Sequence, residues 1–197
     1  AVADALLHDI DPAKALRDWA RRVKPGKYVA GYGKQFIRWV SAPTVQPPYN
    51  SYGNGAAMRV SPAAWLATSL DEALSLSDRV TAVTHDHPEG MKGARATVHA
   101  IWLARAGEPS EGIRKAISRD YGYDMDRCVD QVRETHQYNE SCQGTVPEAF
   151  ICALEAQDYE DALRNAVSLG GDADTLAAIA GSVASPKRSS TRVTAST

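Results

Sequence analysis

Two carboxylates separated by one residue follow a pair of glycines near the end of the chain, in the string Gly170-Gly171-Asp172-Ala173-Asp174-Thr175. In an extended turn, residues two positions apart point to the same side, so Asp172 and Asp174 can converge on one cation. Oxygen ligands of this kind suit Mg²⁺, Ca²⁺ or Mn²⁺ rather than zinc. The alternative is that Asp174 or Thr175 caps the helix that follows, because side-chain oxygens satisfy free N–H groups at a helix start.

A loop rich in Ser, Pro, Asn, Gly and Tyr spans residues 41–61 and leads into a helix. Long loops inside compact domains are often functional. Gly53, Asn54 and Gly55 allow a ligand to approach the backbone closely, and N–H groups at a helix start can hold phosphate. Tyr49 and Tyr52 can stack on a base. The alternative is an ordinary glycine-rich turn.

A pair of histidines ends another helical pattern, in the string Thr84-His85-Asp86-His87-Pro88, where the proline stops the helix. The His-x-His spacing invites a metal interpretation. No second histidine pair and no His or Cys partner lies at ligand-like spacing in the sequence. Histidines that face solvent or a ligand at a helix end are therefore favoured over a zinc site.

Composition restricts the class of protein. The 197 residues fit one domain with a substantial core, or at most two small ones. The net charge of −2 gives no electrostatic footprint for nucleic acid or an anionic membrane, so direct nucleic-acid binding is not expected. No apolar run is long enough to span a bilayer. Cys128, Cys142 and Cys152 lack CxxC spacing and indicate reduced thiols of a cytoplasmic protein.

Helical periodicity dominates the chain, and strands are nearly absent. The pattern predicts an all-α single domain of about seven to nine helices. Caps are expected at Asp11, at Ser69 or Asp71, and at Asp158, and a further helix is expected to start at Val146-Pro147. The helices are predicted over 1–10, 12–22, 71–83, 89–105, 110–121, 146–154, 159–169 and from 173 onward.

Other segments are less regular. Lys24-Pro25-Gly26 is predicted to break the second helix, and the apolar segment 35–40 fits either a helix or a strand. The polar stretch 121–144 is interpreted as a charged helix plus a connection. The Ser-, Thr-, Lys- and Arg-rich segment 185–197 has almost no apolar content and is expected to be a disordered tail.

Three strings together resemble the ADP-ribosylglycohydrolase family, and most closely its compact bacterial members. They occur in the family's order: residues 51–60 (SYGNGAAMRV), then Thr84-His85, then residues 170–175 (GGDADT). The resemblance covers residues 1–184. It implies an orthogonal all-α bundle that holds two Mg²⁺ ions in a cleft. Such proteins cleave the glycosidic bond that links ADP-ribose to a protein side chain or to another acceptor.

The resemblance also implies roles for individual residues. Asp172, Asp174 and Thr175 match metal ligands of the family, and the two aspartates are the expected catalytic carboxylates. The expected substrate-binding residues are Ser51 and the backbone of Gly53 and Gly55 toward phosphate, Tyr52 against adenine, Asn54 toward ribose, and His85 near the pyrophosphate. A carboxylate can then assist as general base.

The chain departs from the family pattern at both ends. The family has a second ligand set, a Thr-Asp-Asp-Thr string with an upstream acidic residue, and neither occurs in this sequence. We therefore expect a domain that lacks its N-terminal part and binds Mg²⁺ weakly, because this ion prefers near-complete octahedral coordination. Two functions remain open: a truncated hydrolase, and an inactive remnant that binds ADP-ribose or has lost function. A metal hydrolase built on His85 and His87, unrelated to ADP-ribose, is a third alternative.

Overall fold

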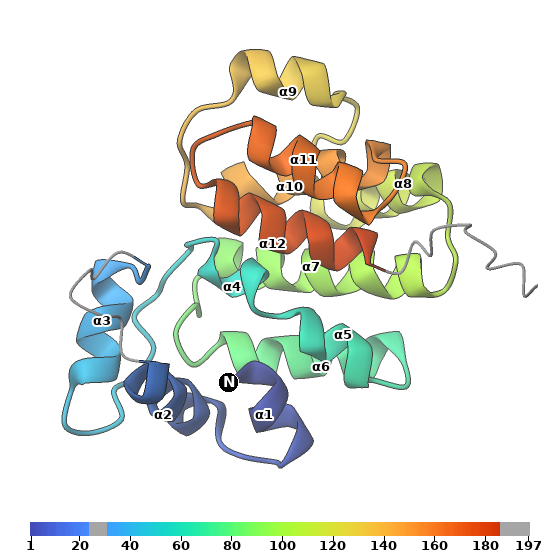
Figure 1. Ribbon diagram of the computed structural model, residues 1–197. Helices are drawn as coiled ribbons and strands as arrows, with labels where there is room; N and C mark the ends of the chain where they lie inside the picture. The colour runs from blue at the N-terminus through green and yellow to red at the C-terminus, as the bar shows by residue number, and fades with distance from the viewer. Residues whose placement is uncertain (24–30, 186–197) are drawn as a thin grey trace, which may run out of the picture.

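The computed structural model describes residues 1–23 and 31–185 and confirms the all-α fold class (Figure 1). Within these ranges the structure has twelve helices and no strand, apart from one isolated bridge between Gly53 and Ser141. The helices are α1 (Val2–Leu7), α2 (Pro12–Val23), α3 (Lys34–Ser41), α4 (Gly55–Met58), α5 (Ser61–Leu66), α6 (Leu70–Thr81), α7 (Pro88–Arg105), α8 (Ser110–Tyr121), α9 (Val129–Thr135), α10 (Cys142–Glu155), α11 (Tyr159–Ser168) and α12 (Ala173–Ala184).

The helix count exceeds the expected number mainly because short helices were not anticipated. Residues 41–61 were predicted to form a loop that leads into a helix, but α4 lies within that range and α5 starts at its last residue. Such short helices depend on tertiary packing, since isolated short helices are marginal in water. The predicted break at Lys24-Pro25-Gly26 and residues 186–197 of the predicted tail lie outside the described residues.

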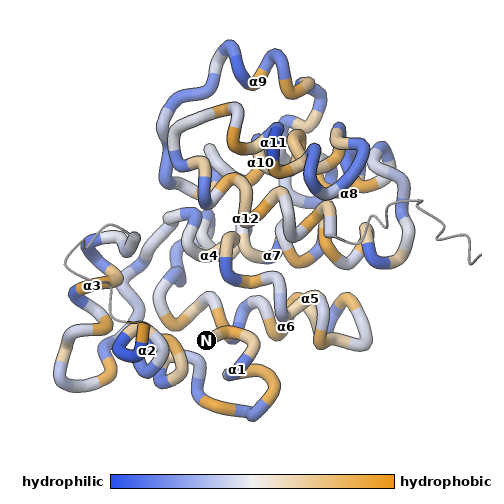
Figure 2. Tube along the Cα trace, viewed as in Figure 1, coloured by the Kyte–Doolittle hydropathy of each residue, from blue (hydrophilic) through white to orange (hydrophobic). Residues whose placement is uncertain are grey.

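Three helices form the centre of the core: α7, α10 and α12 (Figure 1). Their fully buried side chains include Ile101, Phe150, Leu176 and Ile179. Figure 2 shows hydrophobic residues concentrated along α10 and α12, whereas α9 at the edge is mainly hydrophilic. This pattern is that of a helical bundle in which central helices are apolar on most sides and outer helices only on one.

A second, smaller cluster joins α2 to α3. Leu16 of α2 packs with Trp39 and Val40 of α3, so the ambiguous segment 35–40 is helical. Arg17 is buried in this cluster, where its guanidinium donates to the carbonyl oxygen of Trp39 at 2.9 Å and to that of Thr44 at 2.8 Å. These bonds satisfy a charge that would otherwise be expensive to bury.

Local capping was predicted well at several helices and incorrectly at one. The side chains of Asp11, Ser69 and Asp158 each accept a backbone N–H of the first helical turn. The prediction that a helix starts at Val146-Pro147 is wrong, because α10 begins at Cys142 with Ser141 as its cap. Pro147 lies inside α10 and has no N–H to donate to the carbonyl of Gln143, four residues earlier. Gln143 is exposed, so its carbonyl can bond to water instead.

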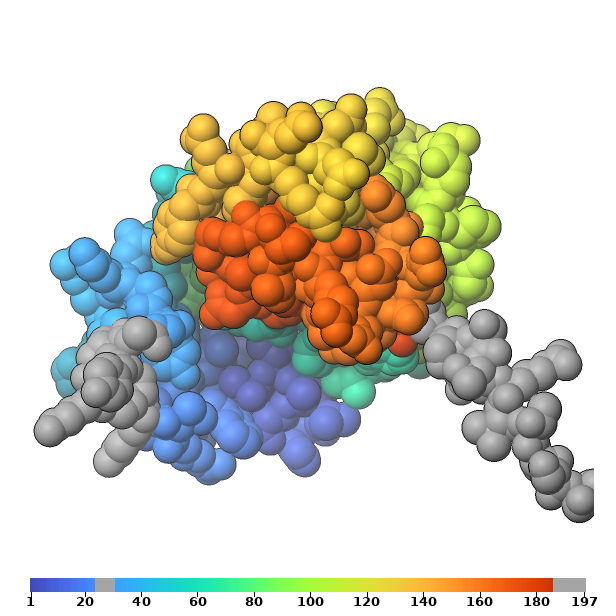
Figure 3. Space-filling view, turned by 45° about the horizontal axis from the view of Figure 1, so that its top comes forward, coloured from blue at the N-terminus to red at the C-terminus, as the bar shows by residue number. Residues whose placement is uncertain are grey.

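The segment from α9 to the start of α10 packs on the C-terminal helices. Arg133 of α9 donates to Ser168 at 2.8 Å and to Asn165 at 3.2 Å. Figure 3 shows the same arrangement, with the yellow segment lying directly against the orange and red segments of α11 and α12. Among the residues that the structure describes, no helix is both long enough and apolar enough to cross a membrane.

Candidate functional site

Residues 51–55, here called the glycine-rich loop, lie against the first turn of α7. The backbone N–H of Ser51 donates to the carbonyl oxygen of Thr84 at 3.4 Å, and Gly53 donates to the Ser51 hydroxyl at 3.2 Å. Gly90 of α7 allows this approach, since a Cβ there would lie 2.5 Å from the carbonyl oxygen of Ser51. The hydroxyl of Ser51 therefore shapes the loop that was predicted to meet phosphate.

The opposite side of the loop is held by the segment before α10. Asn54 donates its backbone N–H to the carbonyl oxygen of Glu140 at 2.7 Å, and Cys142 donates to the carbonyl oxygen of Tyr52 at 2.9 Å. Gly53 and Ser141 form the isolated bridge. The loop is thus fixed on both sides by backbone hydrogen bonds, which favours a preformed conformation.

Asn54 joins the glycine-rich loop to residues 170–175, here called the carboxylate turn. Its side chain is buried, and its amide nitrogen donates to Oδ2 of Asp172 at 2.6 Å and to the hydroxyl of Thr145 at 3.0 Å. This contact brings together two of the predicted motifs. In the structure the amide nitrogen of Asn54 is bonded to the protein, and the expected contact between Asn54 and ribose stays a prediction.

The carboxylate turn starts with two residues in the left-handed region, Gly170 at φ +78° and Gly171 at φ +61°. Asp172 then occupies the N-cap position of α12, but within the described chain its side chain makes no capping hydrogen bond. Asp174 Oδ1 accepts from the backbone N–H of Thr175 at 2.9 Å. The capping alternative named Asp174 or Thr175, and Asp174 does accept a free N–H in the first turn of α12. The carboxylate of Asp172 instead accepts from Asn54.

The surroundings of the carboxylate turn disfavour simultaneous ionisation of Asp172 and Asp174 when no cation is bound. Burial raises the pKa of Asp172, the hydrogen bond from Asn54 lowers it, and the carboxyl group of Asp174 raises it again. Thr175 is buried beside them, and its hydroxyl contacts the sulfur of Met58 at 3.6 Å. A divalent cation would relieve the repulsion between these carboxylates, and three oxygen donors suit Mg²⁺ or Mn²⁺ as a partial ligand set.

His85 lies beneath the glycine-rich loop. A Cβ at Gly55 would lie 3.4 Å from its Nε2 atom, and one at Gly53 would lie 3.7 Å away. Burial, reinforced by the positive charge of Arg59, lowers the pKa of His85 to about 3, so the ring is neutral at neutral pH. Its Nδ1 atom is 2.7 Å from the Thr84 hydroxyl, and that hydroxyl accepts from Arg59 at 2.6 Å.

Tyr52 and His87 stand at the exposed end of the loop. Tyr52 is 51% exposed and meets the ring of His87 edge to face, with 5.3 Å between ring centroids. His87 also caps α7, because its Nδ1 atom accepts the backbone N–H of Glu89 at 3.1 Å. His85 and His87 thus have different partners. The described residues contain no group of three or more His, Cys, Asp or Glu side chains placed to hold a metal ion.

Several residues of this region were missed by sequence reasoning. Thr145 and Glu140 touch the loop but belong to no recognisable motif. Met58 belongs to the quoted loop string, yet its contact with Thr175 bridges residues that are distant in sequence. The sequence did not predict that the polar stretch before α10 contacts the glycine-rich loop, because those contacts are largely made by backbone atoms.

Removing the Asn54 side chain is expected to destabilise the fold by about 1–3 kcal/mol, because Asp172 and Thr145 would lose a buried hydrogen-bond partner. Urea unfolding of Asn54→Ala measures this loss. Gln143→Ala, which deletes an exposed amide on α10, is the control and should change stability little. Equal stabilities of the two variants would show that the Asn54 contacts contribute nothing.

Comparison with known proteins identifies relatives of this chain. The family model for ADP-ribosylglycohydrolase matches residues 1–185. An uncharacterised protein of Archaeoglobus fulgidus is 30% identical over 151 residues, covering 68% of this chain and 48% of that protein. The human protein named ADP-ribosylhydrolase ARH3 is 26% identical over 179 residues, covering 68% of this chain and 49% of that protein.

Structural comparison points the same way. A solved structure described as an ADP-ribosylglycohydrolase-related protein complex superposes with a TM-score of 0.69 and 25% sequence identity. The match covers 93% of this chain and 66% of the other. The chain spans about half the length of the curated relatives that it matches. Because the family model matches nearly the whole of the described chain, this chain belongs to the ADP-ribosylglycohydrolase family.

Proposed function

We propose that the protein is a divalent-cation-dependent hydrolase that cleaves the glycosidic bond of an ADP-ribosylated protein or of another ADP-ribose derivative. The observation that carries the proposal is the hydrogen bond between Asn54 and Asp172, 2.6 Å long. It joins a glycine-rich loop suited to phosphate and a carboxylate turn suited to Mg²⁺ into one region. Family membership supports the class of reaction.

Binding of the ADP-ribose would use the loop and its neighbours. The exposed ring of Tyr52 offers a face for adenine, and the backbone of Gly53 and Gly55 allows a phosphate to approach closely. We assign the neutral ring of His85 the tautomer with its hydrogen on Nε2, because Arg59 donates to the Thr84 hydroxyl and leaves that hydroxyl free to donate to Nδ1. That tautomer directs a donor toward the loop without adding a titrating charge at neutral pH.

Hydrolysis would take place at the carboxylate turn. Asp172, Asp174 and Thr175 would hold the cation, which when bound orients the ribose hydroxyls and makes a water molecule more acidic. A carboxylate of this pair accepts one proton from the attacking water, whose oxygen bonds to the anomeric carbon as the glycosidic bond breaks. The acceptor leaves with the electron pair of that bond and takes up a proton from solvent.

A second candidate function is binding of ADP-ribose without hydrolysis. It is favoured by one observation: in the described chain no further carboxylate, histidine or cysteine joins Asp172 and Asp174 in a group that could hold a metal. Release of ADP-ribose from a modified protein separates the two functions. Release that requires Mg²⁺ and stops with a chelator would support the hydrolase. Binding of ADP-ribose without release would support the second function.

Removing the ring of Tyr52 is expected to weaken ADP-ribose binding about tenfold, because stacking of a base on an aromatic side chain is worth about 1–3 kcal/mol. Calorimetric titration with ADP-ribose measures the effect of Tyr52→Ala. Tyr159→Ala is the matched control, since Tyr159 is a similarly exposed tyrosine on α11. An unchanged affinity for Tyr52→Ala would show that the stacking assignment is wrong.

A further inference from the structure

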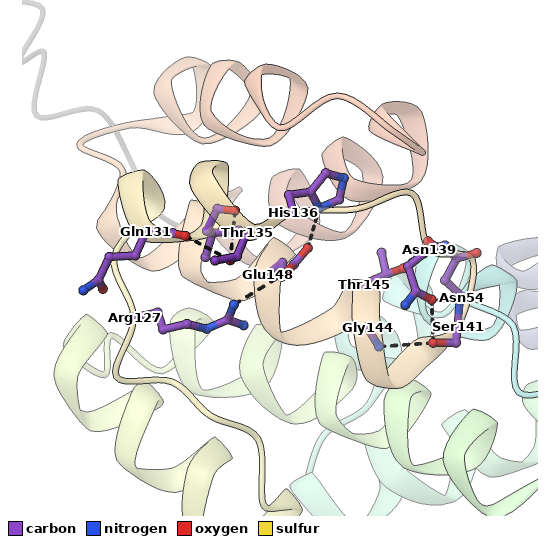
Figure 4. Close-up of polar contacts among 11 residues, drawn as sticks. Asn54, Arg127, Gln131, Thr135, His136, Asn139, Ser141, Gly144, Thr145 and Glu148 are labelled. Carbon is purple, nitrogen blue, oxygen red and sulfur yellow. Dashed lines mark hydrogen bonds and ion pairs between the residues drawn. The ribbon is translucent and has the colours of Figure 1, made fainter.

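His136 lies in the connection between α9 and α10, and the proposed reaction does not use it (Figure 4). Its side chain is 6% exposed, and its Nδ1 atom lies 2.7 Å from a carboxylate oxygen of Glu148 on α10. The second oxygen of Glu148 faces Arg127 at 3.8 Å. Because the carboxylate only accepts, Nδ1 of His136 is the donor, which fixes the orientation of the ring.

The other face of this histidine lies against the carboxylate turn. Its Nε2 atom is buried and has no hydrogen-bond partner among the described residues. A Cβ on Gly171 would lie only 2.6 Å from that Nε2 atom, whereas a Cβ on Gly170 would have nothing within 4 Å in the described structure. The ring of His136 therefore packs directly under Gly171, one residue before Asp172.

The residues that follow His136 reach the glycine-rich loop. The carbonyl oxygen of Asn139 accepts from the Thr145 hydroxyl at 3.0 Å, and that of Glu140 accepts from the backbone N–H of Asn54 at 2.7 Å. Figure 4 shows Asn139, Ser141 and Thr145 close to Asn54, with His136 and Glu148 farther along α10. The segment 136–142 thus touches the carboxylate turn at one end and the glycine-rich loop at the other.

We propose that His136, held by Glu148, is a positioning residue that fixes the turn carrying Asp172 and Asp174. The ring blocks movement of Gly171 toward α10, and the segment 136–142 keeps the turn in register with the glycine-rich loop. Small displacements of catalytic groups reduce catalysis strongly, so a rigid support of this kind has a large effect. The catalytic consequence rests on the proposed function, whereas the packing of His136 on Gly171 does not.

The two glycines give a matched test of the packing. Both have positive φ, so an alanine at either position carries a similar backbone penalty, but only at Gly171 would it meet His136. We expect Gly171→Ala to lower the melting temperature more than Gly170→Ala does. In a His136→Ala background, the difference between the two should shrink. Equal effects of the two glycine variants with His136 present, or a difference unaffected by His136→Ala, would overturn the proposal.

A second measurement tests positioning as distinct from stability. His136→Ala should shift the NMR amide resonances of residues 170–175 and weaken Mn²⁺ binding, followed by water proton relaxation, on the order of tenfold, as for outer-shell changes at metal sites. His136→Asn retains a nitrogen donor near the position of Nδ1 and should restore part of both. If His136→Ala does not fold, His136→Asn serves as the background for comparing Gly170→Ala with Gly171→Ala. Unchanged resonances and an unchanged Mn²⁺ affinity in a folded variant would overturn the proposal.

The two proposals fail in different ways. If the parent protein binds neither Mn²⁺ nor ADP-ribose, the proposed function fails, while the glycine comparison and the amide resonances still decide the role of His136. If the parent binds both and the His136 variants bind equally well, the positioning role fails and the proposed function stands.

Discussion

Acidification is expected to lower the free energy of unfolding by about 1 kcal/mol per pH unit through His85 alone, between pH 6.5 and about pH 4. The pKa of this histidine is about 3 in the folded protein, against 6.5 for an imidazole in the unfolded chain. Between these values the unfolded chain binds a proton that the folded protein does not. The contribution of His85 to stability is therefore fully present above pH 6.5 and is lost as pH falls toward the folded pKa.

Urea unfolding at a series of pH values measures this effect. His85→Gln cannot take up the proton, so its stability should fall less steeply with acidification than that of the parent protein. His8→Gln is the matched control, because it removes a histidine whose side chain is 65% exposed. Parallel pH profiles for His85→Gln and the parent would contradict the proposed burial of a neutral imidazole.

Local features of the fold were predictable because their causes lie within a few residues. Ser69 and Asp158 were expected to cap helices, and each accepts the N–H of the residue three positions later. The segment 35–40 was ambiguous, because its helical state depends on packing of Trp39 against α2 rather than on its own pattern. The early start of α10 was missed because a proline was taken as a helix start, although it is tolerated where the unpaired carbonyl is exposed.

For the candidate site too, local features were predictable from the sequence and long-range contacts were not. Its residue types and their order were recognisable in the sequence, but the contact between Asn54 and Asp172 joins positions 118 residues apart. No local periodicity reports such a contact. His136 gave no signal either, since it lies in a polar stretch and its importance comes from Gly171, whose missing side chain leaves room for the ring. Support residues of this kind are found only from the folded arrangement.

Replacing Asp172 by asparagine is expected to abolish most cation-dependent release of ADP-ribose, by on the order of a hundredfold or more, while slightly stabilising the fold at neutral pH. Burial and the nearby Asp174 raise the pKa of Asp172, so its ionised form is disfavoured in the folded protein. Asparagine removes that charge and still offers an acceptor to Asn54. The gain is expected to be small, since the carboxylate is partly solvated and screened.

The pH dependence of this gain identifies its origin. A group whose folded pKa is raised contributes stability at low pH that is lost as pH rises through the folded pKa. The advantage of Asp172→Asn should therefore be present at neutral pH and disappear as pH falls toward 3.8, the ordinary pKa of an aspartate in the unfolded chain. Glu111→Gln on α8 is the matched control, because Glu111 is an exposed carboxylate far from the turn in sequence and should change neither stability nor release. Loss of stability at neutral pH in Asp172→Asn would mean that the carboxylate is stabilised by its neighbours, as in a structural cap. Retained release would exclude Asp172 from the reaction.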